Sequence, residues 1–109
     1  MTIKEAQTLV DEWISTTGKG YFQPVTNVAV LAEEVGELAH VVLRRYGEQK
    51  PKPGDATDDK AIAEELSDVL WVTLALANQM GIDLTESLRE GLEKRAIRDK
   101  DRFSHSDSH

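Results

Sequence analysis

Two pairs of carboxylates are the residues of this chain whose types and spacing could do chemistry. Glu34 and Glu37 lie three positions apart, and Glu65 and Asp68 repeat that spacing further along. In a helix, residues three apart share one face. Each pair is flanked along its row by valine or alanine, so these acids would lie beside apolar surface. Neighbouring helices tend to pack antiparallel, which would bring the two pairs face to face.

Four clustered carboxylates point to a bound divalent cation. Unless they are protonated or neutralised, close pairs repel by several kcal/mol at an effective dielectric of about 20. A ligand set made only of oxygen favours Mg²⁺ or Mn²⁺ over zinc or copper. A di-iron bundle would require Glu-x-x-His on two helices, and neither pair contains histidine. The alternative is that the acids are ordinary solvated helix faces, but two apolar-flanked pairs on adjacent helices favour the metal site.

The elements that must position these acids are helices. Three stretches rich in glycine and proline divide the chain, and no segment between them shows sustained strand alternation. We predict an all-α, four-helix bundle-like fold in a single domain over residues 1–103, followed by a polar, mobile tail over 104–109. The spacing of apolar residues and the capping residues predict helices over 2–16, 24–46, 58–81 and 83–102.

The two acid-bearing helices also carry apolar stripes, which we expect to form the core. From Val69 to Ala77 the second of them is apolar nearly all round, and a chain of 109 residues can hardly surround it. We therefore expect oligomerisation to complete the fold, as a homodimer or homotetramer, with Trp71 packed against another subunit. The stripes comprise Val28, Leu31, Ala32, Val35, Leu38, Ala39, Val42 and Tyr46 in the first helix, and Ile62, Leu66, Val69, Thr73, Leu76 and Met80 in the second.

Composition narrows the class of protein. Acidic residues outnumber basic ones by 20 to 13, for a net charge of -7. This charge disfavours nucleic acid polymers and anionic membranes as partners. Cysteine is absent, which excludes disulfides, thiolate metal sites and cysteine nucleophiles. Because the amino-terminal residues lack signal-peptide features and no apolar run reaches membrane-spanning length, we expect a cytoplasmic protein.

The acidic motifs are similar to those of a known family. Residues 33–37 read Glu-Glu-Val-Gly-Glu and residues 65–68 read Glu-Leu-Ser-Asp. This order resembles the signature of the MazG-like nucleotide pyrophosphohydrolases, Glu-Glu-x-x-Glu followed by Glu-x-x-Asp, and the likeness covers nearly the whole chain. The resemblance implies a MazG-type fold that uses Mg²⁺, or Mn²⁺ in its place, to hydrolyse nucleoside triphosphates to monophosphate and pyrophosphate. Such an enzyme would serve nucleotide-pool house-cleaning.

The resemblance also implies roles for the acids. Glu34, Glu37, Glu65 and Asp68 would hold the metal, and Glu33 would orient or deprotonate the attacking water. The alternative for Glu33 is a solvent-facing residue on the flank of its helix. Glu33 also distinguishes an enzyme from the remaining alternative, a non-catalytic helical module that only binds a metal or a protein partner. Such a module does not need a general base. A phosphoribosyl-ATP pyrophosphohydrolase is a second enzyme with this scaffold and chemistry.

Contacts to the substrate are predicted at scattered positions. Lys94 and Arg98 lie four apart, as in the late Lys-x-x-x-Arg of the family, which implies contact with the phosphates; compensation of the helix dipole is the alternative. Family members have an asparagine near position 78, so Asn78 is a candidate nucleotide ligand or else a polar surface residue. Residues that could stack on the base, or simply pack in the core, are Tyr21, Phe22 and Trp71, with His40 as a further aromatic candidate.

Overall fold

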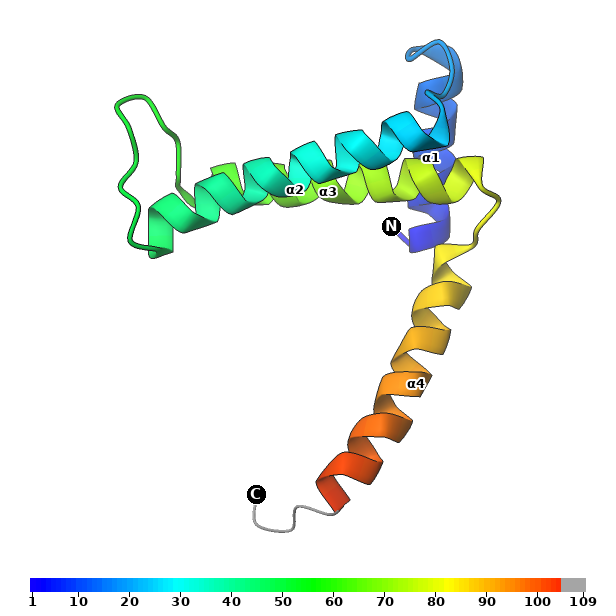
Figure 1. Cartoon of the computed structure of the whole chain (residues 1–109). Coiled ribbons are helices and arrows are strands. Elements are labelled where there is room, and N and C mark those ends of the chain that lie inside the picture. The colour runs from blue at the N-terminus through cyan, green and yellow to red at the C-terminus, as the bar shows by residue number, and fades with distance from the viewer. Residues whose placement is uncertain (105–109) are drawn as a thin grey trace.

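The computed structural model describes residues 1–104, which form four helices connected by loops (Figure 1). Their bounds are α1 Ile3–Thr16, α2 Pro24–Tyr46, α3 Asp59–Gln79 and α4 Leu84–Ser104. The predicted all-α class is confirmed, and α4 ends two residues later than predicted. Apart from Ser104, the predicted polar tail lies outside the described residues.

Local sequence decides where the helices begin and end. Thr2 caps α1 through a capping box, in which Thr2 and Glu5 each accept a hydrogen bond from the other's backbone N–H at 3.0 Å. Asp58 caps α3 and Asp83 caps α4, each by accepting a backbone N–H at 2.9 Å. Gly81 has a φ of 69° just after α3, a conformation that glycine adopts without steric cost.

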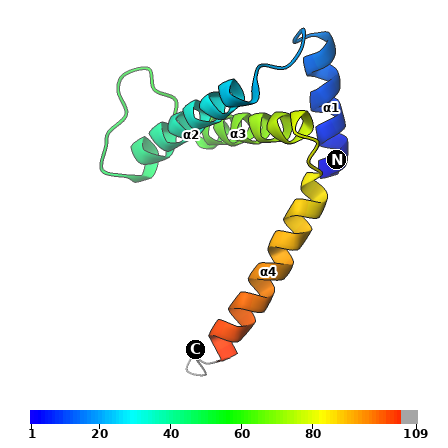
Figure 2. The same cartoon turned by 45° about the vertical axis from the view of Figure 1, so that its right-hand side comes forward.

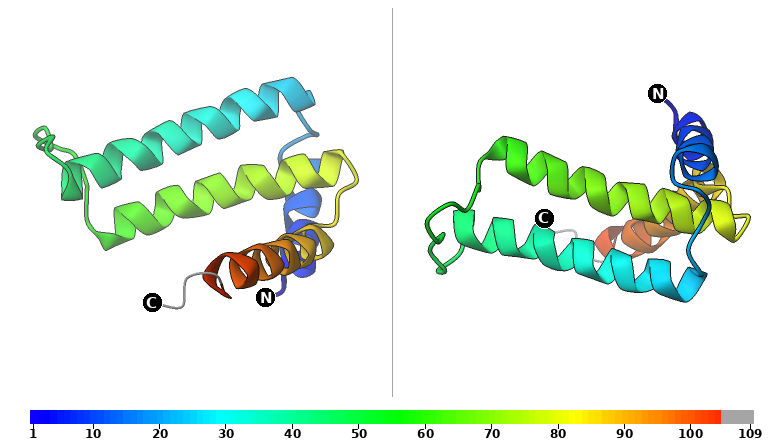
Figure 3. Two further views of the ribbon diagram at one scale, coloured as in Figure 1. Left: turned by 60° about the horizontal axis from the view of Figure 1, so that its bottom comes forward. Right: turned by 90° about the horizontal axis from the view of Figure 1, so that it is seen from above.

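The helices α2 and α3 run antiparallel, side by side, and form the body of the molecule (Figures 1 and 3). α1 crosses this pair at the end where α2 begins and α3 finishes, and α4 leaves from the same end and projects away (Figure 2). The radius of gyration is 17.9 Å, whereas a compact domain of about 100 residues has about 13 Å. A single chain is therefore extended, and α4 has little of the chain to pack against.

A small apolar core fastens α1 to α3. Val10 and Ile14 of α1 pack with Leu74 and Ala75 of α3, and all four side chains are buried. Beside this core the ring of Trp13 meets the ring of Trp71 edge to face, with centroids 5.3 Å apart. The Trp71 side chain stays partly exposed within the chain.

The predicted core stripes of α2 and α3 are only partly buried in the single chain, where Leu76 of α3 is 7% exposed. Val28 and Val35 of α2 are 55% and 47% exposed, and Leu66 of α3 is 53% exposed. Val41 and Val72, which belong to the acid-bearing rows, are buried. The physical reason is that α2 and α3 turn their acidic rows toward each other, which leaves part of each apolar stripe facing outward.

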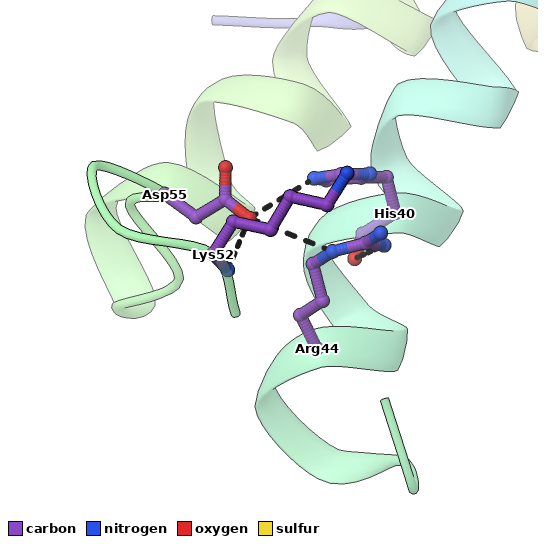
Figure 4. A network of polar contacts seen from close by, with 4 residues as sticks. All are labelled: His40, Arg44, Lys52 and Asp55. Carbon is purple, nitrogen blue, oxygen red and sulfur yellow. Dashed lines mark hydrogen bonds and ion pairs between the residues drawn. The ribbon is translucent and has the colours of Figure 1, made fainter. Parts of the chain in front are cut away.

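The loop that joins α2 to α3 is fastened by one carboxylate, Asp55 (Figure 4). Its Oδ2 accepts the backbone N–H of Lys52 at 2.9 Å and lies 3.6 Å from His40 Nε2. Arg44 Nε is 3.5 Å away, an ion-pair distance that lacks hydrogen-bond geometry. The Lys52 N–H, followed by the charges of His40 and Arg44, lowers the pKa of Asp55. His40 thus contacts the loop.

Candidate active site

Antiparallel packing brings carboxylates from α2 and α3 together. Glu34 and Glu37 of α2 and Glu65 of α3 each offer an oxygen, and these three oxygens lie within 4.8 Å of one another. Asp68 follows one turn along α3 from Glu65, and its charge acts on both Glu34 and Glu65. The two acidic pairs therefore meet across the interface between the two helices, as the sequence predicts.

The ionised form of these clustered carboxylates is energetically unfavourable. Oε2 of Glu34 and Oε2 of Glu65 are buried and have no hydrogen-bond partner among the described residues. Burial, and then the charges of the neighbouring acids, raise the pKa of Glu34. Burial and the nearby Glu37 do the same to the pKa of Glu65. Unpartnered buried oxygens are unfavourable, so a cation or a proton donor that the described residues do not supply would stabilise this site.

The donor set fits a hard divalent cation. Within the described part of the chain, none of these acids forms an ion pair with lysine, arginine or histidine. Three converging carboxylates, with Asp68 as a fourth nearby, are oxygen ligands of the kind that Mg²⁺ and Mn²⁺ prefer. Glu33 lies outside the three-oxygen group, exposed on the flank of α2, and its charge adds to the rise in the pKa of Glu34.

A cavity of about 450 Å³ opens beside the acids. Among the described residues its walls include four aromatic side chains, and Glu34 and Asp68 line the same space. The structure thus joins the predicted base-stacking residues to two of the predicted metal ligands. Gly18 allows this arrangement, because a Cβ there would lie 3.0 Å from the Trp13 ring. The aromatic residues are Trp13, Tyr21, Phe22 and Trp71.

Three predicted substrate contacts lie away from this cavity in the single chain. Asn78 uses its amide to join α3 to α1: its Nδ2 donates to the Gln7 carbonyl at 2.8 Å, and its Oδ1 accepts from Gln7 Nε2 at 3.0 Å. Lys94 and Arg98 lie on the projecting α4 and do not line the cavity. Arg98 Nε is instead 3.2 Å from the Asp99 carboxylate.

Sequence reasoning missed Asn27, which lines the cavity and is 6% exposed. Its Nδ2 donates to Oε1 of Gln79 at 2.7 Å. A signal was present in the chain, because Asn27 precedes Val30 and Glu34 at helical spacing and so extends the acidic row by one turn. This signal is weak, because a lone asparagine in a helix is usually a surface residue.

Comparison with known proteins assigns the chain to a family. A MazG nucleotide pyrophosphohydrolase domain matches residues 22–103. The chain belongs to the MazG nucleotide pyrophosphohydrolase family. Both acidic motifs fall inside the matched residues. The resemblance inferred from these motifs is confirmed.

Two solved structures share the fold of this chain. The uncharacterized protein YpjD of Bacillus subtilis strain 168 is 46% identical over 104 residues, or 94% of this chain and 91% of YpjD. The crystal structure of YpjD covers 86% of this chain and 94% of its own, with a TM-score of 0.77 and 42% identity. A Bacillus-conserved MazG protein, a nucleotide pyrophosphohydrolase, has a TM-score of 0.73 and 38% identity over 86% of this chain and 88% of its own. The predicted MazG-type four-helix fold is thereby confirmed.

Uncharacterized protein YvdC of the same strain is a more distant relative, 28% identical over 99 residues, which are 86% of this chain and 92% of YvdC.

None of the described helices of this MazG domain combines the length and the hydropathy needed to span a bilayer.

Proposed function

We propose that the chain is a Mg²⁺-dependent nucleoside triphosphate pyrophosphohydrolase, which releases nucleoside monophosphate and pyrophosphate. The observation that carries this proposal is the group of three carboxylate oxygens within 4.8 Å at the edge of an aromatic cavity. The acids alone would repel a triphosphate, whereas the aromatic walls suit a base. A nucleotide therefore fits here when it arrives with a divalent cation, and Mn²⁺ can take the place of Mg²⁺.

The acids have two different roles in the proposed reaction. Glu34, Glu37, Glu65 and Asp68 would hold the cation, which when bound polarises the phosphate and lowers the pKa of a water. Glu33, exposed beside this group, orients the attacking water and accepts its proton at the carboxylate. The water oxygen joins the α-phosphorus, and the bond to the bridging oxygen breaks as pyrophosphate leaves.

The aromatic cavity would receive the base. Tyr21, Phe22 and Trp71 line it and can stack on a planar ring. Asn78 could reach a nucleotide only by giving up its two contacts with Gln7. We assign the reaction to nucleotide-pool house-cleaning in the cytoplasm, where surplus or unwanted triphosphates would be the substrates.

A second copy of the chain completes this site in our proposal. Lys94 and Arg98 would neutralise the leaving pyrophosphate, yet their helix projects away from the acids of its own chain (Figure 2). A homodimer or homotetramer would bring α4 of one copy to the acids of another and would cover the exposed apolar stripes of α2 and α3. Size-exclusion chromatography with light scattering checks this point, and a stable monomer at micromolar concentration would contradict it.

Product analysis tests the reaction. Canonical and modified nucleoside triphosphates are incubated with the protein and Mg²⁺, and products are resolved by ion-exchange chromatography. Monophosphate with pyrophosphate is expected, and EDTA should stop its formation. Absence of monophosphate from every substrate would overturn the proposal, and diphosphate with orthophosphate would mean that another bond is cleaved. If only phosphoribosyl-ATP reacts, the enzyme is of that second type.

Matched variants locate the reaction in the acidic cluster. Glu37→Gln and Glu65→Gln should each abolish turnover, because each removes a charged ligand of the proposed metal site. Glu64→Gln removes the same charge from an exposed neighbour on α3 and should keep turnover near the wild-type rate. Activity in both cluster variants would show that the site is misplaced.

A further inference from the structure

We propose that Asn27 selects the nucleobase, because its Oδ1 is placed to accept a hydrogen bond from the exocyclic amino group of a 4-aminopyrimidine or a 6-aminopurine. This inference rests on the proposed function, which puts a base in the aromatic cavity. It adds a specificity-determining residue that no sequence motif marks.

The orientation of the Asn27 amide follows from a chain of two hydrogen bonds. The backbone carbonyl of Phe22 can only accept, and Gln79 Nε2 donates to it at 2.8 Å. Gln79 must therefore turn its Oε1 toward Asn27, whose Nδ2 donates to that oxygen at 2.7 Å. The donor side of the Asn27 amide is thus directed at Gln79, and its Oδ1 is left on the other side.

That oxygen has no donor within the described chain. Among the described residues, Asn27 is the one buried polar side chain, at 6% exposure, and it lines the aromatic cavity. Because this oxygen is not among the buried unpartnered atoms of the described residues, it is accessible to a ligand in the cavity. A ligand in the cavity gains affinity if it presents an N–H to this oxygen, so the contact is selective for a donor.

The position of Asn27 along α2 matches the layout of a nucleotide. Asn27 and Glu34 lie seven residues apart on one face, which is two helical turns and about 10.5 Å along the axis. Glu34 belongs to the acidic cluster, where the phosphates and their cation would lie. The Asn27 end of the same cavity is therefore the end that the base would reach.

An amino group satisfies this site better than a keto group does. Cytosine and uracil differ at position 4, where one carries an NH₂ donor and the other an oxygen acceptor. Adenine and hypoxanthine differ in the same way at position 6. A keto oxygen facing Oδ1 would place two acceptors together with no proton between them. The imino N–H of the keto bases lies at the neighbouring ring atom, so it reaches Oδ1 only if the base shifts along its edge.

Two isosteric substrate pairs test the inference on the wild-type protein. We expect kcat/KM to be about tenfold higher for CTP than for UTP, and for ATP than for ITP, since one neutral hydrogen bond contributes about this factor. Equal values within both pairs, or a preference for the keto base, would overturn it. Binding of CMP and UMP by isothermal titration calorimetry gives the same comparison without turnover. If no triphosphate is hydrolysed, the proposed function fails, and the calorimetric ratio still decides the role of Asn27.

Three variants separate base selection from a structural role. Asn27→Leu should bring the CTP to UTP ratio close to one. Gln79→Leu frees the Asn27 amide to turn and should lower the ratio. Gln79→Glu loses the bond to the Phe22 carbonyl but keeps an acceptor for Nδ2, so it should retain the ratio. If Asn27 is only structural, Asn27→Leu slows both nucleotides alike and leaves the ratio unchanged, which would overturn the inference. Circular dichroism checks folding, and if Asn27→Leu does not fold, the wild-type pairs and the two Gln79 variants decide.

Discussion

Replacing Glu65 by glutamine should stabilise the metal-free protein while removing its response to metal. In the absence of a cation, Glu65 adds negative charge to a group that already holds Glu34 and Glu37. Glutamine keeps the size of the side chain and removes the charge. In EDTA, the variant is therefore expected to have a higher free energy of unfolding than the wild type. Adding Mg²⁺ should raise that free energy little further.

The size of the effect follows from the geometry. The carboxylate oxygens of Glu34, Glu37 and Glu65 lie within 4.8 Å of one another. Two unit charges at that separation repel by about 3.5 kcal/mol at an effective dielectric of 20 and by about 0.9 kcal/mol in water. Because the cluster is partly exposed, the true value per pair lies toward the lower limit. Glu65 has two such neighbours, so we expect a gain of about 1 to 3 kcal/mol in the free energy of unfolding.

Thermal denaturation followed by circular dichroism measures both parts of the prediction. At pH 7.5 in EDTA, Glu65→Gln should raise Tm by roughly 4 to 8 °C for each kcal/mol gained. In the wild type, Mg²⁺ at 100 times its Kd should add about 2.7 kcal/mol, and in the variant this gain should largely vanish. Glu64→Gln, the matched control, should change neither value by more than about 0.5 kcal/mol. A metal-free Glu65→Gln protein less stable than the wild type would refute the reasoning, since Glu65 would then be making net favourable contacts.

Three further predictions concern other parts of the molecule. Glu33→Gln should lower kcat by roughly 10²- to 10⁴-fold and leave the Mg²⁺-induced rise in Tm intact; an unchanged kcat would remove Glu33 from the reaction. The pKa of Asp55 is lowered, so its contribution to stability is present above the unfolded value and is lost only as pH falls through the folded pKa, below 3.8. An NMR titration of the Lys52 amide, which donates to Asp55, reports this midpoint, and a value above 3.8 would contradict the assignment. Leu74→Ala should cost about 2 to 5 kcal/mol in urea denaturation, because Leu74 lies in the buried core; a loss under 1 kcal/mol would mean that the core reorganises around it.

Much of the local structure could be predicted because it depends on residues close together in the chain. Thr2, Asp58 and Asp83 cap helices through bonds to residues two or three positions away, so the sequence predicts a helix start at or beside each of them. The i, i+3 spacing of Glu34 with Glu37, and of the second pair, likewise places each pair on one face. The family followed from the same spacing, since its signature consists of these acids.

The face that each helix buries could not be predicted from periodicity. On α2 the stripe of Val28 and Val35 is more apolar than the row of Glu34 and Glu37, so hydrophobic pattern alone favours the stripe as core. The structure turns the acidic row inward and leaves both valines about half exposed. Which face of α2 is buried depends on how α2 packs against α3. The pattern of apolar residues along the sequence shows only that two faces could be buried.

The helices, their ends to within about two residues, the two acidic pairs and the family could all be predicted from the order of residues along the chain. The tertiary structure alone decided which residues share the site: it brought Glu34 to Glu65, held Asn27 against Gln79, and carried Lys94 away on α4. The physical reason is range. Caps and helical periodicity act over about four residues, whereas the contact between Asn27 and Gln79 spans 52 positions and exists only because α2 and α3 pack antiparallel.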